Sequence, residues 1–134
     1  MILNAENAFK EYFEDHMVDL IGNGNYEIGI YEHLIPDDAA GDVLVCQLET
    51  PAPSQHRGNY LVRMRFVARA NKKSNGFALI QNMDLLIDRR AVADLTSDIE
   101  MCTCLRIAGP DYITERSMHF YTCLYDVQLR KTDL

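Results

Sequence analysis

Apolar and polar side chains alternate along the last third of the chain, and this period of two predicts one long β-hairpin from Asp98 to Leu129. Gly109-Pro110-Asp111 combines three residues that favour chain reversal, so the turn is predicted there. The predicted register divides the side chains between two faces. One face carries Met101, Thr103, Leu105, Ile107, Phe120 and Leu124, and the other carries Cys102, Cys104, Arg106, His119, Tyr121, Cys123 and Tyr125.

Both faces of this predicted hairpin carry large or apolar groups. A sheet with one face on helices and the other in water would be more polar on its second face. We therefore expect a second buried surface on the hairpin, most simply against another subunit.

Two other stretches have the spacing of amphipathic helices. The first runs from about Leu3 to Ile21 and ends at a Gly-Asn repeat, and the second runs from about Gly76 to Ala91. Ser74 or Asn75 is available to cap the second helix. Each helix has one apolar stripe, so each is expected to cover part of a sheet.

The remaining strands are shorter or more polar. Strands are predicted around Ile28, from Val43 to Glu49 and from Asn59 to Asn71, with a polar loop over Thr50–Gly58. The predicted order is α-β-β-β-α-β-β, an α+β fold with a mainly antiparallel sheet and two amphipathic helices on one face. The length of 134 residues fits a single domain over 1–134.

Composition narrows the possible partners. The hydrophobic fraction of 48% and the charged fraction of 25% are typical of a globular chain. A net charge of -7 disfavours general nucleic-acid binding. No apolar run reaches membrane-spanning length and the start of the chain lacks a signal-peptide pattern, so synthesis in the cytoplasm, no membrane partner and reduced cysteines are expected.

Three arginines share one face of the predicted Asn59–Asn71 strand. Arg63, Arg65 and Arg69 form a basic stripe without interleaved aromatic side chains, so base stacking is not indicated. The stripe could contact a phosphate or the carboxylates of a partner, or it could face solvent and pair with the acids of this chain. The sequence favours neither interpretation.

No catalytic motif is present, so no enzyme activity and no cofactor are predicted. Cys102, Cys104 and Cys123, with His119 nearby on the predicted face, could hold zinc in an alternative metal-binding or enzymatic domain. Strand residues converge poorly on one metal, and cysteine is a common buried residue, so the metal site is disfavoured. Asp37 and Asp38 lack further oxygen ligands at loop spacing.

The order of these segments resembles the small tail-terminator and tail-to-head joining proteins of long-tailed bacteriophages, some of which are described as minor capsid proteins. The resemblance extends over nearly the whole chain and concerns order, length and a few turn residues. The segments are an N-terminal helix, Ile28-Gly29-Ile30-Tyr31, Pro36-Asp37-Asp38, Tyr60-Leu61-Val62-Arg63-Met64-Arg65-Phe66, Ile107-Ala108-Gly109-Pro110-Asp111-Tyr112-Ile113 and the strand from Glu115-Arg116 to Tyr121.

This resemblance implies a structural protein of the virion at the junction of tail and neck. Such proteins form a ring, typically a hexamer, that caps the head-proximal end of the tail tube and joins it to the neck. DNA would pass through an acidic lumen without specific binding. Another head-tail connector or minor capsid component is the alternative. In the ring, the predicted subunit contacts are Arg63, Arg65 and Arg69, and the predicted contacts with tube or neck are Asp37, Asp38, Gln55, His56 and Arg57.

Overall fold

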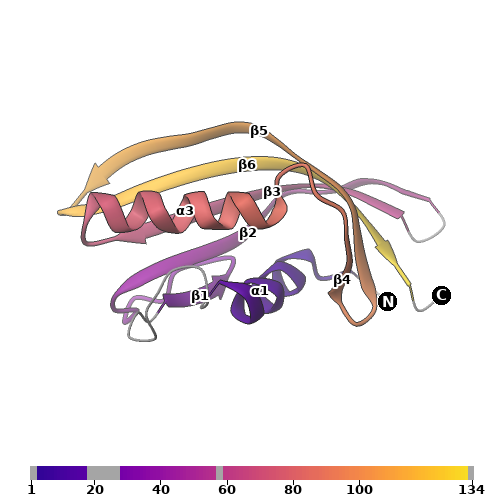
Figure 1. The fold of residues 1–134 in the computed structure, drawn as a ribbon, viewed down its shortest axis with the longest axis horizontal. Coiled ribbons are helices and arrows are strands. Elements are labelled where there is room, and N and C mark those ends of the chain that lie inside the picture. The colour runs from indigo at the N-terminus through magenta and orange to yellow at the C-terminus, as the bar shows by residue number, and fades with distance from the viewer. Residues whose placement is uncertain (1–2, 18–27, 57–58, 133–134) are drawn as a thin grey trace.

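The computed structural model describes residues 3–17, 28–56 and 59–132, and has the predicted α+β fold (Figure 1). Two helices accompany one six-stranded sheet in the order β1-β2-β3-β6-β5-β4. The chain order differs from the prediction only by an added strand, β4, before the hairpin. The elements are α1 (Ala5–His16), β1 (Ile28–Glu32), β2 (Asp42–His56), β3 (Asn59–Ala70), α3 (Lys73–Ile87), β4 (Val92–Thr96), β5 (Ile99–Glu115) and β6 (Met118–Lys131).

The sheet is antiparallel apart from the pairing of β1 with β2, which is parallel. β1 and β4 lie at opposite edges of the sheet, yet both contact α1. The sheet is therefore curled around this helix. α3 lies along β3 and β6 (Figure 1). Both helices thus cover the same face, as predicted.

The helices begin differently. The side chain of Asn4 accepts a hydrogen bond from the backbone N–H of Asn7 at 3.0 Å, and so caps α1. The prediction that Ser74 or Asn75 caps the second helix is wrong. That helix already begins at Lys73, and Lys72 at the cap position makes no side-chain capping bond.

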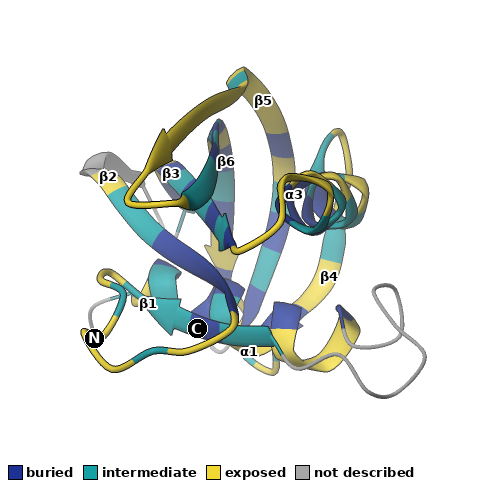
Figure 2. Ribbon diagram, turned by 90° about the vertical axis from the view of Figure 1, so that its left-hand side faces the viewer, coloured by how far each residue is buried: buried dark blue, intermediate teal, exposed yellow. Residues whose placement is uncertain are grey.

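The core lies between the helices and the face of the sheet that they cover. Phe66 of β3 is fully buried at its centre, and its ring lies 5.2 Å from that of Phe9, 5.4 Å from that of Phe13 and 5.5 Å from that of Tyr125. Along β3 every second residue from Tyr60 onward is buried, which is the period of a strand with one covered face (Figure 2). The side chains of α3 that reach this core are Leu79, Ile80, Met83 and Ile87.

The predicted hairpin exists, but its turn lies six residues later than expected. Gly109 and Pro110 are part of β5, and the chain reverses at Arg116 and Ser117, between Glu115 and Met118. Arg116 has φ 51° and Ser117 has φ 64°, the positive values that a two-residue hairpin turn requires. Gly109, at φ 94°, lies instead at a register shift within β5, between Ala108 and Asp111.

The predicted register holds for part of the hairpin only. Cys104 does share the helix-covered face with Cys123 and Tyr125, because it pairs with Val127 in the ladder. The prediction that Met101 shares the opposite face with Phe120 is wrong. A register shift between Met101 and Thr103 turns Met101 toward the core, where it pairs with Leu129 and is fully buried.

The segment predicted as a polar loop over Thr50–Gly58 is mostly strand. β2 continues to His56 and pairs with β3 as far as the pair of His56 with Asn59. Register shifts after Leu48 and after Thr50 allow this continuation through a stretch with two prolines. Residues 57–58 lie outside the described ranges.

Candidate interaction surface

The face of the sheet opposite the helices carries exposed apolar side chains. This helix-free face is formed by the alternate residues of β2, β3, β5 and β6 that point away from the core. Leu61 is 51% exposed and Leu105 is 50% exposed there. Ile113 pairs with Phe120 on the same face and is 60% exposed. The expectation that the hairpin carries apolar groups on both faces is confirmed.

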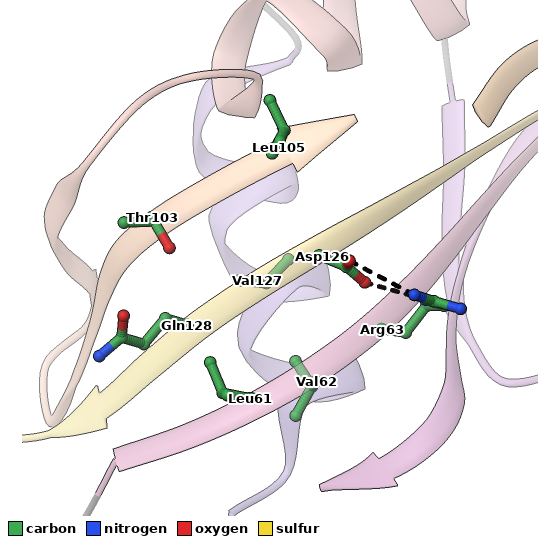
Figure 3. Close-up of a pocket in the computed structure, with 8 residues that line it drawn as sticks. All are labelled: Leu61, Val62, Arg63, Thr103, Leu105, Asp126, Val127 and Gln128. Atoms are coloured by element: carbon green, nitrogen blue, oxygen red, sulfur yellow. Dashed lines mark hydrogen bonds and ion pairs between the residues drawn. The ribbon is translucent and has the colours of Figure 1, made fainter. Parts of the chain in front are cut away.

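A hollow of about 570 Å³ lies on this face, across β3, β6 and β5 (Figure 3). Leu61 of β3 and Leu105 of β5 lie on opposite sides of β6, and Arg63 meets Asp126 between these two strands (Figure 3). The lining residues are Leu61, Val62, Arg63, Thr103, Leu105, Asp126, Val127 and Gln128. An apolar hollow with one ion pair at its edge can accept an apolar side chain of a partner and orient it by charge.

The basic stripe is largely paired with acids of the same chain. Arg63 donates to both carboxylate oxygens of Asp126, at 2.8 Å from Nε and 3.3 Å from Nη2, and this contact raises the pKa of the arginine. Arg65 donates to Glu49 Oε1 at 2.8 Å. Exposed pairs of this kind contribute little to stability, so both arginines can exchange their acid for one on another molecule.

The third arginine of the stripe has a different role. Arg69 Nη2 donates to the backbone oxygens of Ala39, at 2.9 Å, and of Gly41, at 3.3 Å. These bonds tie the loop between β1 and β2 to the edge of the helix-free face. Val43, which pairs with Arg69 in the ladder, is fully buried although it points away from the helices.

The structure separates the other predicted contact residues into two places. Asp37 and Asp38 are exposed in the loop between β1 and β2. Gln55 and His56 belong to the end of β2, where their backbones pair with Tyr60 and Asn59, and Arg57 lies outside the described residues. The predicted contact residues therefore do not form one continuous patch within the described ranges.

The cysteines considered as an alternative metal site do not lie on one common face. Cys102 lies at the register shift of β5 and pairs with no residue of β6, whereas Cys104 and Cys123 are buried in the core. Burial raises the pKa of Cys104 to about 12 and that of Cys123 to about 11, and it raises the pKa of Cys46 well above its usual value. Thiols that stay protonated at neutral pH are poor nucleophiles and poor metal ligands. Within the described residues, no three histidine, cysteine or acidic side chains gather closely enough to hold a metal ion.

The far end of the β5–β6 hairpin carries an aromatic cluster that the sequence pattern did not single out. Tyr112 stacks on His119, and the Tyr112 hydroxyl lies 2.6 Å from Nδ1 of the imidazole. The ring of Tyr121 lies 4.9 Å from that of Tyr112 and 5.9 Å from that of Phe77 on α3. Lys73 Nζ lies 4.8 Å above the Tyr112 ring. This cluster fastens the start of α3 to the hairpin.

Comparison with known proteins gives a likeness of fold. No protein-family model matches the sequence, and no curated protein matches it either. A chain in the solved structure of the virion of a native gene transfer agent (GTA) particle has a similar fold. Its TM-score is 0.62 at 11% sequence identity, and the match covers 94% of this chain and 94% of that chain. No helix among the described residues is long and apolar enough to cross a membrane.

Proposed function

We propose that this chain is a structural protein of a phage-like virion. The observation that carries the proposal is the likeness of fold over 94% of both chains to a protein of the GTA virion. Because the match covers nearly all of both chains, it supports a common architecture and not merely a shared substructure. A helix-free sheet face with exposed leucines is consistent with a chain that works in contact with others.

Within the virion, we assign this chain to the ring that caps the head-proximal end of a tail tube and joins it to the neck. The whole chain, 1–134, acts as one tail-terminator-like domain in this ring, and six copies are the expected number. The partners are other copies of the chain, the tail tube protein and the neck protein. DNA passes through the lumen without specific binding, because a subunit with a net charge of -7 repels phosphate.

A closed ring requires two different patches on each subunit that fit one another. The helix-free face supplies one of them, with Arg63 and Arg65 exchanging their internal acids for acids of the neighbour. Arg69 contributes by holding the loop between β1 and β2 at the edge of this face. Gln55 and His56 at the end of β2 remain the proposed contact with tube or neck, together with Arg57, which lies outside the described residues.

The experiment is a measurement of particle mass over a wide range of concentration, by native mass spectrometry, with and without purified tail tubes. A species of about six subunits, alone or on tube ends, supports the proposal. If the ring forms but binds a portal or neck preparation instead of tubes, the chain is another connector component. A chain that stays monomeric and ignores both preparations would overturn the proposal.

The arginine contacts have their own test. Arg63→Glu and Arg65→Glu, made singly, are each expected to raise the concentration at which rings form, because each places an acid beside Asp126 or Glu49. Lys10→Glu is the matched control, since Lys10 lies on α1 and, within the described residues, forms an ion pair only with Glu14. Ring formation that is equal in all three variants would remove the arginines from the subunit contact and leave the ring itself standing.

A further inference from the structure

Five exposed lysines and arginines make no ion pair within the described residues, and four of them lie at the two ends of α3, whereas Arg116 lies in the turn between β5 and β6. Lys72 precedes the first residue of the helix, and Arg89 and Arg90 follow its last turn. Lys73, beside Lys72, has the Tyr112 ring and no acid as its partner. In a chain of net charge -7, two unpaired cationic ends on one helix are unusual and indicate an acidic partner.

Between these cationic ends, α3 exposes apolar side chains. Phe77 is 46% exposed and Leu85 is 58% exposed, with the exposed Gln81 between them. Their spacing of four residues places these three side chains in one row, about 12 Å long at 1.5 Å per residue. We call Phe77, Gln81 and Leu85 the α3 ridge.

The loop between β1 and β2 has the complementary chemistry. Leu34 is 67% exposed, the largest value among the large hydrophobic side chains that the structure describes. Asp37 and Asp38 follow it on the same loop, are exposed, and make no ion pair within the described ranges. We call Leu34, Asp37 and Asp38 the acidic knob.

The acidic knob is held in place rather than free to collapse onto its own chain. Gln47 Nε2 donates to the backbone oxygen of His33 at 2.9 Å, and the N–H of Leu34 donates to the backbone oxygen of Glu32 at 2.7 Å. Arg69 holds the other end of the loop at Ala39. A leucine that is kept exposed by a braced loop costs little ordering entropy when a partner covers it.

We propose that the α3 ridge of one copy docks on the acidic knob of the next copy. Figure 2 shows α3 to the right of the sheet and β1, from which the loop leaves, to its left. Two complementary patches on opposite sides of a molecule make a head-to-tail contact, which closes into a ring when the rotation is right. Leu34 packs between Phe77 and Leu85, while Asp37 and Asp38 meet Arg89 and Arg90 at the C-terminal end of the helix instead of contacting tube or neck. This inference rests on the proposed ring and assigns to its subunit contact a pair of complementary patches in addition to the helix-free face.

The decisive experiment mixes two defective chains. Leu34→Ser removes the knob, Leu85→Ser breaks the ridge, and each alone is expected to raise the midpoint concentration of ring formation about 10- to 100-fold. In an equal mixture, one copy keeps its ridge and the other keeps its knob. The mixture should therefore form heterodimers and stop there. Ala93→Ser is the control, because Ala93 is exposed on β4 and belongs neither to these two patches nor to the helix-free face.

Charge reversal supplies a second variant set that leaves the apolar side chains intact. Asp37→Lys with Asp38→Lys, or Arg89→Glu with Arg90→Glu, should each weaken the ring about 10-fold or more, whereas all four changes in one chain should restore it to within about threefold. Circular dichroism confirms that each variant is folded.

The outcomes separate this contact from the ring itself. Rings of normal midpoint in Leu34→Ser and Leu85→Ser overturn the contact while the proposed function stands. If the Leu85→Ser variant forms rings but no longer binds tail tubes, the ridge contacts the tube. That result also overturns the contact between the ridge and the knob. A wild-type chain that stays monomeric even with tail tubes overturns the proposed function.

Discussion

The two faces of β3 differ sharply although they belong to one strand. Toward the helices, Met64 and Phe66 are fully buried in a core of aromatic rings. Away from the helices, Leu61 is half exposed, and Arg63 and Arg65 pair with exposed acids at 2.8 Å. One row of side chains therefore stabilises the subunit, while the other row contributes little to its folding and is available for contacts.

This difference teaches that stability and assembly can be changed separately in this chain. Successive side chains of a strand point to opposite faces. Substitutions one residue apart on β3 should consequently affect different properties. Substitutions on the buried face should change stability, and substitutions on the exposed face should change self-association.

The largest effect is expected from Phe66→Ala. The substitution removes a ring that contacts three other aromatic rings and leaves a cavity, so the free energy of unfolding should fall by about 3–5 kcal/mol. Chemical denaturation of the purified chain measures this loss. Val67→Ala, the next residue on the opposite face, is the control and should cost about 1 kcal/mol or less. Equal losses for the two variants would show that the helix-free face is as important for folding as the core.

A smaller effect is expected from alkaline pH, and it tests the helix-covered face of the hairpin. The Cys104 thiol has a pKa of about 12 in the fold against a usual value of 9.0. Above pH 9 the unfolded chain loses this proton while the folded chain keeps it. Stability is therefore fully present below pH 9 and declines as the pH rises, by about 1.4 kcal/mol per pH unit for each such thiol.

Denaturation in a reducing buffer at pH 8, 9 and 10 measures this decline. Cys104→Ala should flatten the slope, because the thiol that titrates only in the unfolded chain is gone. Cys102→Ala is the matched control on the same strand, because the Cys102 side chain is less buried than that of Cys104. An identical slope in the wild type and in Cys104→Ala would contradict the assignment.

The smallest effect on folding is expected on the helix-free face. Leu61→Ser and Leu105→Ser together remove the exposed apolar rim of the hollow, and the midpoint of thermal unfolding should stay nearly unchanged. The same double variant should weaken self-association, which sedimentation measures. A large loss of stability with unchanged association would reverse the roles that we assign to the two faces.

The fold class and most of the strands could be predicted because these elements leave a local, periodic pattern. The Asn59–Asn71 run alternates over twelve residues, and the structure has a strand from Asn59 to Ala70. The hairpin likewise alternates from Met118 onward. Such patterns record which side of an element is covered, and no knowledge of distant contacts is needed to read them.

The details of β5 could not be predicted because they depend on the ladder as a whole. Gly109-Pro110 has the composition of a turn, whereas the actual turn at Arg116 and Ser117 lacks the Asn-Gly or Asp-Gly pair that is typical of a two-residue hairpin turn. Two non-glycine residues adopt positive φ there because the paired strands on either side impose it. The shift at Met101 is equally invisible to a strict period of two.

The candidate surface was only partly predictable, for a related reason. The basic stripe on β3 was visible, but its pairing with Asp126 and Glu49 requires knowledge of the neighbouring strands. The sequence analysis did not single out Phe77, Leu85 or Leu34, because apolar residues in a helix or a loop carry no signal of exposure. The packing of α3 on the sheet leaves Phe77 and Leu85 exposed, and the braced loop leaves Leu34 exposed. Neither arrangement can be read from the sequence.

The outer edge of β5 has one more consequence. β4 pairs with the first part of this strand, between Ile99 and Met101, so the stretch that contains Pro110 has no neighbour beyond it in the described sheet. An open edge of this length would normally invite a foreign strand to add to the sheet. Pro110 offers no N–H to such a strand, the register shifts bend the edge, and Asp111 and Glu115 place like charges along it. Copies of this chain can thus reach a high local concentration without edge-to-edge strand pairing into fibres. Side-chain contacts, and not backbone pairing, then determine the number of subunits in the assembly.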